Sequence, residues 1–166
     1  MAEVEALPVD AWHCATFGEL DGLRKLVEAK EEIDKPDDRG FTPLTWSARN
    51  GHMECMKYLI EQECSLESPS FGGLRPLHHA CNKNLERVVR ALIAAKADAN
   101  SLDDNLDTPM HYACARGVLN IVVALIGASG DITKPNSQGI TPLHKACIFG
   151  QFGVVKKLIE VNEVGI

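Results

Sequence analysis

Hydrophobic residues recur along the chain at intervals of 33 residues. Neighbouring pairs of aliphatic residues mark one register, at 26–27, 59–60, 92–93, 125–126 and 158–159. Another apolar residue stands about one helical turn earlier in each segment: Leu23, Met56, Val89, Val122 and Val155. Apolar positions three or four residues apart form one face of an amphipathic helix, so each segment predicts a helix. The fixed period predicts one structural unit repeated along the chain.

A second motif has the same period and predicts a second helix in each unit. Pro followed by Leu or Met occurs at 43–44, 76–77, 109–110 and 142–143. Thr precedes three of these pairs; its hydroxyl caps a helix, and Pro suits the first helical position, where no N–H is needed. A small residue follows on each predicted helix, at Ala48, Cys81, Cys114 and Cys147. Ala15 extends this row into an N-terminal unit without the Thr-Pro start.

The segment Gly139–Gly150, repeated at this period, closely resembles the ankyrin repeat. The resemblance covers residues 9–166. It implies an all-α ankyrin-repeat solenoid of stacked antiparallel helix pairs with short hairpin-like loops. We expect an N-terminal tail at 1–8 and a single domain of five repeats. The expected repeats are 9–41, 42–74, 75–107, 108–140 and 141–166.

Several residues depart from the repeat pattern, among them Arg75, Leu106 and Asn84. Arg75 replaces the capping Thr, which should cost about 1 kcal/mol. Leu106 stands where the turn glycine is expected, and a left-handed backbone there would be strained. Asn84 replaces the glycine after a first helix, but Asn tolerates that conformation. We expect the third repeat to be the least stable.

Charge narrows the range of partners. The 166 residues include 17 Lys and Arg and 23 Asp and Glu, for a formal net charge of −6. Residues 1–67 alone hold 15 acidic and 7 basic side chains. An acidic front half repels phosphate backbones, so nucleic acid is not expected to bind. A protein partner with a basic segment would instead be attracted.

The N-terminal residues and the cysteines indicate the cellular compartment. The first residues, Met1 to Glu5, are acidic where a secretory signal would be basic and then apolar. No apolar run approaches the length of a membrane span, so membrane insertion is not expected. Six cysteines without a secretory signal are expected to be reduced. We predict a protein of the cytoplasm, with the nucleus as the alternative.

Three His-Cys pairs raise the question of metal binding or thiol catalysis. They are His78 with Cys81, His111 with Cys114, and His144 with Cys147. Their repetition favours a structural role, and Ala48 fills the cysteine position in another repeat. The resemblance implies that the histidines hydrogen-bond locally between loops. We predict no catalytic, metal or cofactor site, and we expect Cys64 to be the most exposed thiol.

Partner-binding residues in a repeat array are expected outside its regular core. For ankyrin domains, the resemblance points to the loop tips and the exposed face of the first helix. The candidates are Arg39, Phe41, Arg49, Phe71, Leu74, Lys83, Asn105, Asp107, Arg116 and Phe149. A further row at 33-residue intervals should form an aromatic-to-basic stripe on the concave side: Trp46, His79, Tyr112 and Lys145. The alternative is that these side chains fill gaps between helices.

These patterns predict a non-enzymatic protein–protein interaction module of the adaptor, scaffold or inhibitor type. It would bind through the concave helix face and the loop tips. A basic partner segment followed by an acidic or apolar one would match the surface. One alternative is an architectural or self-associating segment, suggested by the apolar residues Phe152, Val155 and Ile159 near the C-terminal end. A less favoured alternative is a metal-dependent or Cys-His enzyme.

Overall fold

The computed structural model describes residues 10–164, and for Val164 it describes the backbone alone. The predicted tail at 1–8 lies outside the described residues. Within 10–164 the chain forms ten α-helices, one short 3-10 helix and no strand. The helices are α1 (Ala11–Phe17), α2 (Leu20–Glu28), α3 (Pro43–Asn50), α4 (Met53–Glu61), α5 (Pro76–Asn82), α6 (Glu86–Ala94), α7 (Pro109–Arg116), α8 (Leu119–Gly127), α9 (Pro142–Ile148) and α10 (Phe152–Val164), with η1 at Phe71–Gly73.

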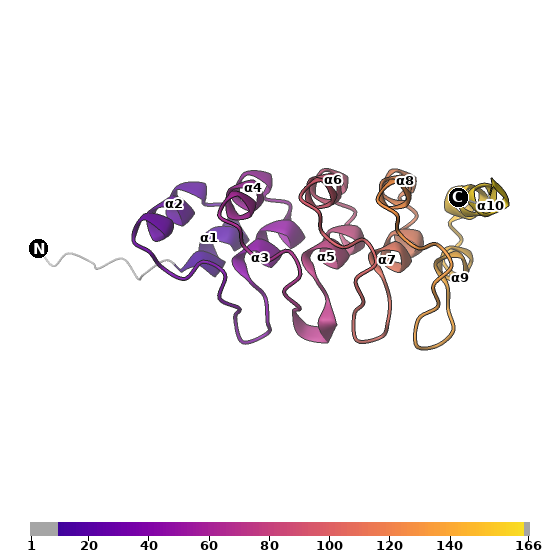
Figure 1. Ribbon diagram of the computed structural model, residues 1–166, viewed down its shortest axis with the longest axis horizontal. Coiled ribbons are helices and arrows are strands. Elements are labelled where there is room, and N and C mark those ends of the chain that lie inside the picture. Colours follow the sequence, from indigo (N-terminus) through magenta and orange to yellow (C-terminus); the bar gives the residue numbers. More distant parts are fainter. Residues whose placement is uncertain (1–9, 165–166) are drawn as a thin grey trace, which may run out of the picture.

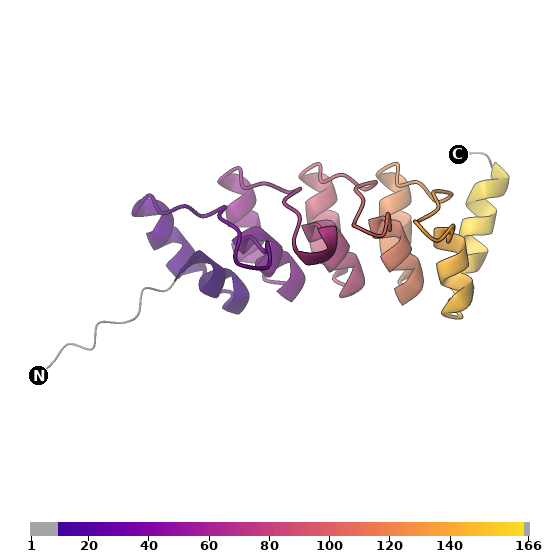
Figure 2. The ribbon, with the colours of Figure 1, turned by 90° about the horizontal axis from the view of Figure 1, so that it is seen from below.

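The helices form two rows that run along the length of the molecule (Figures 1 and 2). Each odd-numbered helix packs against the next odd-numbered helix and against the helix that follows it in its own pair. The loops between pairs project from the side of the odd-numbered row (Figure 1). This arrangement confirms the predicted all-α solenoid of stacked antiparallel helix pairs.

Local sequence explains where the odd-numbered helices begin and end. The hydroxyl of Thr42 accepts a hydrogen bond from the N–H of Thr45 at 3.2 Å, and Pro43 takes the first helical position. Gly51 ends α3 with a φ of 81°, a left-handed conformation that glycine adopts without steric cost. These short-range signals set helices of seven or eight residues, which present one turn of apolar side chains to each neighbour.

The core lies between the two rows of helices. Several of the predicted repeating positions are fully buried there: Leu44 and Leu77 of the odd-numbered row, and Leu59, Leu92 and Leu125 of the even-numbered row. Ile60, Ile93 and Ile126 are half-buried, and Ile159 on α10 is 45% exposed. One continuous cluster of buried residues runs through all five helix pairs of the described residues. In the last pair it includes Ala146, Val154 and Leu158. The core is therefore a chain of similar interfaces, as expected for a repeat array.

The departures from the repeat pattern have visible consequences. Leu106 and Asn84 adopt positive φ values of 60° and 59°, which confirms the left-handed backbone expected at both positions. Arg75 provides no hydroxyl cap; its N–H donates to Nδ1 of His78 at 3.2 Å instead. Its guanidinium pairs with Glu67 at 3.2 Å and donates to the carbonyl of Leu102 at 2.5 Å. These contacts tie Arg75 to two loops and offset the missing cap.

The exposure of the cysteines corrects the sequence prediction. Cys64 is buried, because the chain after α4 folds back beneath Ile33 and Asp34. Cys147 is exposed, although Cys81 and Cys114 at the same register are fully buried. The outer side of α9 meets no further helix within residues 10–164, so Cys147 lacks the cover that the next pair provides elsewhere. The expectation that Cys64 is the most exposed thiol was wrong.

One rapidly reacting thiol is therefore expected in the folded protein. Cys147 should react with a disulfide reagent at the rate of a free thiol. The other five cysteines should react at least about 100-fold more slowly, because a buried thiol must wait for local opening of the fold. Burial also raises the pKa of Cys64 and Cys114 to about 12, which leaves both thiols protonated.

The measurement is a time course of reagent consumption, with Cys147→Ser as the test variant and Cys64→Ser as its control. Cys147→Ser should abolish the fast phase and Cys64→Ser should leave it intact. A fast phase that survives Cys147→Ser would show that another cysteine is accessible.

Candidate functional site

The loops between helix pairs are held by side chains at one register. The Oδ1 atom of Asp37 accepts hydrogen bonds from the N–H groups of Arg39 at 2.9 Å and Phe41 at 2.8 Å. Asp103 and Asn136 make the same pair of bonds in their own loops. A carboxylate or amide that bonds its own backbone in this way stabilises a tight turn. The loop tips are thus fixed in position before any partner binds.

Neighbouring loops are also joined to one another. The N–H of Phe71 donates to the carbonyl of Arg39 at 2.7 Å, and the N–H of Asp104 donates to the carbonyl of Gly72 at 3.0 Å. The N–H of Ser137 donates to the carbonyl of Asn105 at 2.9 Å. The loops therefore form one continuous edge along the molecule (Figure 1). The predicted site residue Asn105 lies on this edge, outside the two hollows described below.

The row at 33-residue intervals braces the loops against the helices. Three members each bond a residue nine positions earlier: Trp46 to Asp37 at 3.0 Å, His79 to Ser70 at 2.8 Å, and Tyr112 to Asp103 at 2.6 Å. The fourth, Lys145, reaches Asp107 in the preceding loop at 3.1 Å. The polar atoms of the row are therefore used within the protein.

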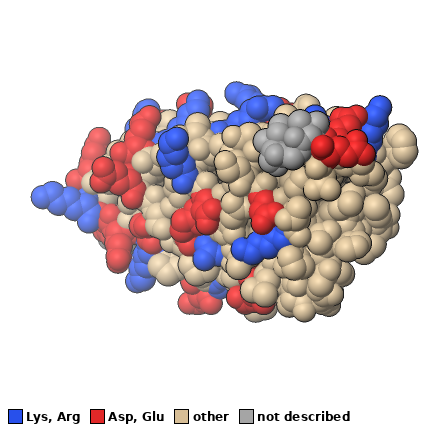
Figure 3. All heavy atoms as spheres, turned by 45° about the vertical axis from the view of Figure 1, so that its right-hand side comes forward, with Lys and Arg blue, Asp and Glu red and all other residues tan. Residues whose placement is uncertain are grey.

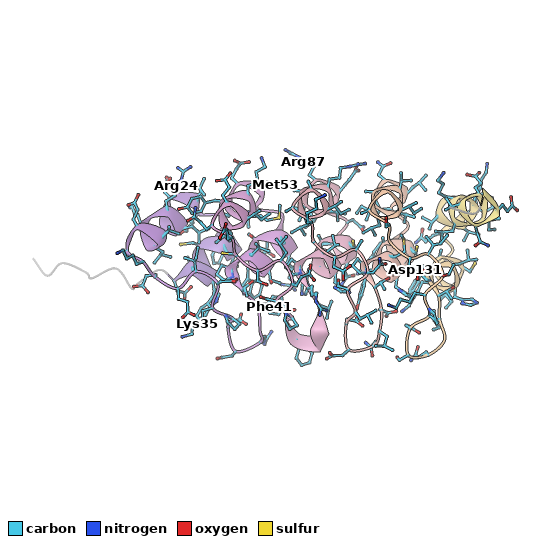
Figure 4. All side chains as sticks on the ribbon, viewed as in Figure 1. Arg24, Lys35, Phe41, Met53, Arg87 and Asp131 are labelled. Atoms are coloured by element: carbon cyan, nitrogen blue, oxygen red, sulfur yellow. The ribbon has the colours of Figure 1, made fainter. Side chains whose placement is uncertain are left out.

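Seven of the predicted residues line one groove between α3, α5 and their loops. We call it the Phe41 groove; its volume is about 630 Å³. Its lining residues are Arg39, Phe41, Arg49, Phe71, Leu74, His79, Asn82 and Lys83. Figure 4 shows Phe41 at the side of the odd-numbered helices from which the loops project.

Aromatic rings form the floor of the Phe41 groove. Phe41 stacks on Trp46 with ring centroids 4.6 Å apart, and the centroid of the His79 ring lies 5.1 Å from that of Phe41. The guanidinium of Arg49 lies over both Phe41 and Trp46, at 5.7 and 5.2 Å from the ring centroids. These contacts leave Phe41 only 8% exposed, whereas Phe71 on the rim is 81% exposed.

The charge of the Phe41 groove is positive. Arg39, Arg49 and Lys83 line it, and none of the three forms an ion pair with another described residue. Burial, followed by the nearby charge of Arg49, lowers the pKa of His79 to about 4, so this ring is neutral at pH 7. The groove thus combines three cations with apolar side chains and no carboxylate.

A second hollow lies between α7 and α9, and we call it the Tyr112 pocket. Its volume is about 290 Å³, and it is lined by Asn82, Asp107, His111, Tyr112, Ala115, Arg116, Lys145 and Phe149. The polar groups here bond one another. Asp107 accepts from Lys145 at 3.1 Å and from Asn136 at 2.8 Å. Arg116 donates two hydrogen bonds to Oδ1 of Asn82 at 3.0 and 2.7 Å.

Sequence reasoning missed three residues that line these hollows. Asn82 contributes to both of them, and Ala115 and His111 contribute to the Tyr112 pocket. A signal for two of them was present, because Asn82 and Ala115 stand 33 and 66 residues after Arg49. The same register therefore faces the inner surface in each pair.

The histidines of two His-Cys pairs join neighbouring loops, whereas His144 and Cys147 of the third pair are exposed and His144 bonds only Thr141. Nδ1 of His78 accepts the N–H of Arg75, and its Nε2 lies 3.1 Å from the carbonyl oxygen of Asp107 in the next loop. His111 makes the equivalent bonds to Thr108 and Ile140. Burial lowers the pKa of both rings and raises the pKa of the adjacent thiols. A neutral imidazole whose two nitrogens are both hydrogen-bonded, beside a protonated thiol, is not arranged for acid-base or nucleophilic chemistry.

Within 10–164, no cluster of three or more His, Cys, Asp or Glu side chains is arranged to hold a metal ion. In the same part of the chain, every helix is too short or too polar to cross a bilayer.

Comparison with known proteins agrees with this architecture. A family model described as "Ankyrin repeats (3 copies)" matches residues 11–103 and 82–165. The human protein named DNA-binding protein RFXANK is 40% identical over 57 residues, which is 31% of this chain and 22% of that protein. Human ankyrin repeat domain-containing protein 39 is 37% identical over 41 residues, which is 25% of this chain and 22% of that protein. The chain therefore spans less than a quarter of the length of either relative.

Proposed function

The chain belongs to the ankyrin-repeat family, whose repeats are generally protein-interaction modules, and from this premise we propose a specific mode of binding. The protein acts as a non-enzymatic adaptor, scaffold or inhibitor that holds a partner protein on its inner surface. That surface consists of the odd-numbered helices and the loop tips, and corresponds to the concave face expected from the sequence. The observation that carries the proposal is the Phe41 groove, an open hollow of arginine and aromatic side chains.

Rigidity of the loops supports this function. The turns at Asp37 and Asp103 and the bonds between loop tips hold the rim of the groove in one arrangement. A partner then binds without a large loss of conformational entropy in the loops. The braces from Trp46 and Tyr112 serve the same purpose, because they fix the loops to the helices.

The proposed partner is a protein rather than a nucleic acid. The name of RFXANK refers to DNA binding, but the match covers only 22% of that protein. A net charge of −6 opposes the approach of a polyphosphate. Exposed acidic side chains at the end of α2 and in the loop that follows it would receive a basic segment of the partner, namely Glu28, Glu31, Glu32 and Asp38.

We place this activity in the cytoplasm or the nucleus. All six cysteines are free in the structure, and five of them are buried in positions that pack as small apolar residues. A reducing compartment maintains such thiols.

Capture from cell extract tests the proposal. We expect Arg39→Ala/Phe71→Ala to capture at least about ten-fold less of a bound protein than the native chain, since truncation of one interface hot spot commonly costs this much. Phe71 is largely exposed and the Arg39 side chain makes no bond to another described residue, so the fold should be kept. Captured proteins are quantified by mass spectrometry.

The matched control is Arg87→Ala/Val123→Ala, which alters an exposed cation and an exposed apolar side chain on the even-numbered helices. It should capture the same proteins as the native chain. Figure 4 shows Arg87 on the side of the molecule opposite the loops. Equal capture by both variants would remove the inner surface from the proposal, and no capture by the native chain would contradict the function itself.

Self-association is a second candidate, favoured by the surface near the C-terminal end. Ile148, Phe149 and Phe152 are exposed there, Phe152 to 79%. Figure 3 shows a broad area without charged side chains at this end, whereas charges crowd the remainder of the same view. Sedimentation velocity over a range of concentrations tests it: a mass that rises with concentration, and falls back in Phe152→Glu, would support a second copy as the partner.

A further inference from the structure

We propose that the Phe41 groove binds a short, acidic segment of the partner protein, in which one apolar side chain is flanked by Asp or Glu. This inference rests on the proposed function and deepens it by stating the chemistry of the bound segment. The apolar side chain would enter between Phe41, Phe71 and Leu74, and the carboxylates would meet Arg39, Arg49 and Lys83.

The apolar half of the groove is held open by an ordered turn. Phe71 lies in η1, where the N–H of Ser70 donates to the carbonyl of Leu74 at 2.8 Å and the N–H of Gly73 donates to the carbonyl of Ser70 at 2.9 Å. Phe71 is nevertheless the most exposed large hydrophobic side chain among the described residues. An exposed phenyl ring beside an apolar floor is a typical feature of a protein-binding surface.

The residue that holds the loop between α4 and α5 brings no carboxylate to the groove. Asp37, Asp103 and Asn136 hold the other loops, and Ser70 takes this position between α4 and α5. Asp37 accepts a hydrogen bond from Trp46 on the helix that follows its loop, and Asp103 accepts one from Tyr112 in the same way. Ser70 instead bonds the neutral ring of His79, and none of the residues that line the groove carries a carboxylate.

The Tyr112 pocket shows what the Phe41 groove lacks. There Lys145 pairs with Asp107, and the guanidinium of Arg116 bonds Asn82. Among the described residues, Arg39, Arg49 and Lys83 have no carboxylate partner, although the chain as a whole is acidic. Charge complementarity therefore assigns carboxylates to the occupant of the Phe41 groove.

A short peptide suits the surroundings better than a polyphosphate. Asp38 is exposed on the loop that carries Arg39, and Glu67 lies near the start of the next loop. A long polyanion crossing the groove would pass these carboxylates. A peptide with a few acidic side chains around one apolar anchor can place its charges on the cations alone.

The probe is a display library of random 12-residue peptides, selected against the whole chain at about 50 mM salt, which limits screening of the groove's cations. Enriched sequences should hold an aromatic or branched aliphatic residue with at least two Asp or Glu within three positions. The most enriched peptide is then synthesised with a fluorophore and titrated by polarisation. We expect Arg39→Glu/Lys83→Glu to weaken its binding at least ten-fold, and Arg39→Gln/Lys83→Gln to weaken it by less.

The matched control, Arg87→Glu/Lys156→Glu, makes the same charge change on exposed side chains of α6 and α10 and should alter binding less than two-fold. Circular dichroism establishes that each variant is folded. Should a charge-reversed groove variant unfold, the Gln variant provides the measurement.

Three outcomes overturn the inference: enriched peptides without acidic residues, acidic peptides that bind the groove variants as tightly as the native chain, or no enrichment. A dodecathymidylate that competes more tightly than the peptide would also overturn it, by assigning the groove to nucleic acid. None of these peptide outcomes contradicts the proposed function, which fails only if extract capture yields no protein that depends on the inner surface.

Discussion

Replacing Leu92 with Ala should lower the free energy of unfolding by about 2–5 kcal/mol. Leu92 is fully buried on α6, which packs against α4, α5 and α8. Truncation removes three carbons from the middle of the stack and leaves a cavity that rigid neighbouring helices cannot close. The effect should be large because a central pair in a repeat array supports the pairs on both sides.

The measurement is urea unfolding followed by circular dichroism, with linear extrapolation to water. Leu119→Ala on α8 is the matched control, because it makes the same substitution at a side chain that is 41% exposed. Its cost should stay below about 1 kcal/mol, since little apolar area is removed from the core. Equal losses at the two positions would mean that the packing around Leu92 is not the source of stability inferred here.

Acidification from pH 7 to pH 5 should also destabilise the protein, with about 2 kcal/mol of the loss due to His79. Burial lowers the pKa of His79 from 6.5 to about 4 in the folded chain. Between pH 6.5 and pH 4 the unfolded chain therefore binds a proton that the folded chain does not bind. The contribution of neutral His79 to the free energy of unfolding is fully present above pH 6.5 and is lost as the pH falls from 6.5 to 4.

The surroundings of His79 account for the direction of the shift. The ring is buried against Phe41, and the positive charges of Arg49 and Lys83 add to the cost of protonation. His78 and His111 shift in the same direction because both are buried, so they add to the loss over the acidic range.

Unfolding free energies at pH 7 and pH 5 should be compared for the native chain, His79→Gln and His13→Gln. Glutamine at position 79 retains a group that can bond Ser70 but does not titrate. The native chain and His13→Gln should lose more stability than His79→Gln, because the side chain of His13 is about half exposed. A pH dependence that is the same in all three would contradict the assignment to His79.

The 33-residue period predicts which residues face the Phe41 groove, but not which of their charges are free to meet a partner. Equivalent positions in a repeat face the same side, so Arg39, Arg49 and Lys83 could be assigned to the inner surface from the 33-residue period. The period also places Lys145 there, but in the folded chain that lysine is paired with Asp107, 38 residues away. The availability of a cation for a partner depends on such distant pairings.

The helix pairs, their order and the apolar core could be predicted from the amino-acid sequence, because caps, turns and amphipathic faces depend on residues within one unit of 33. The sequence also pointed to the residues that line the groove. Only the tertiary structure decided that the row from Trp46 to Lys145 braces the loops and that Cys147 rather than Cys64 is exposed. The physical reason is that burial and ion pairing depend on contacts between neighbouring units: Asp107 meets Lys145 in the Tyr112 pocket, whereas Arg39, Arg49 and Lys83 have no carboxylate partner among the described residues.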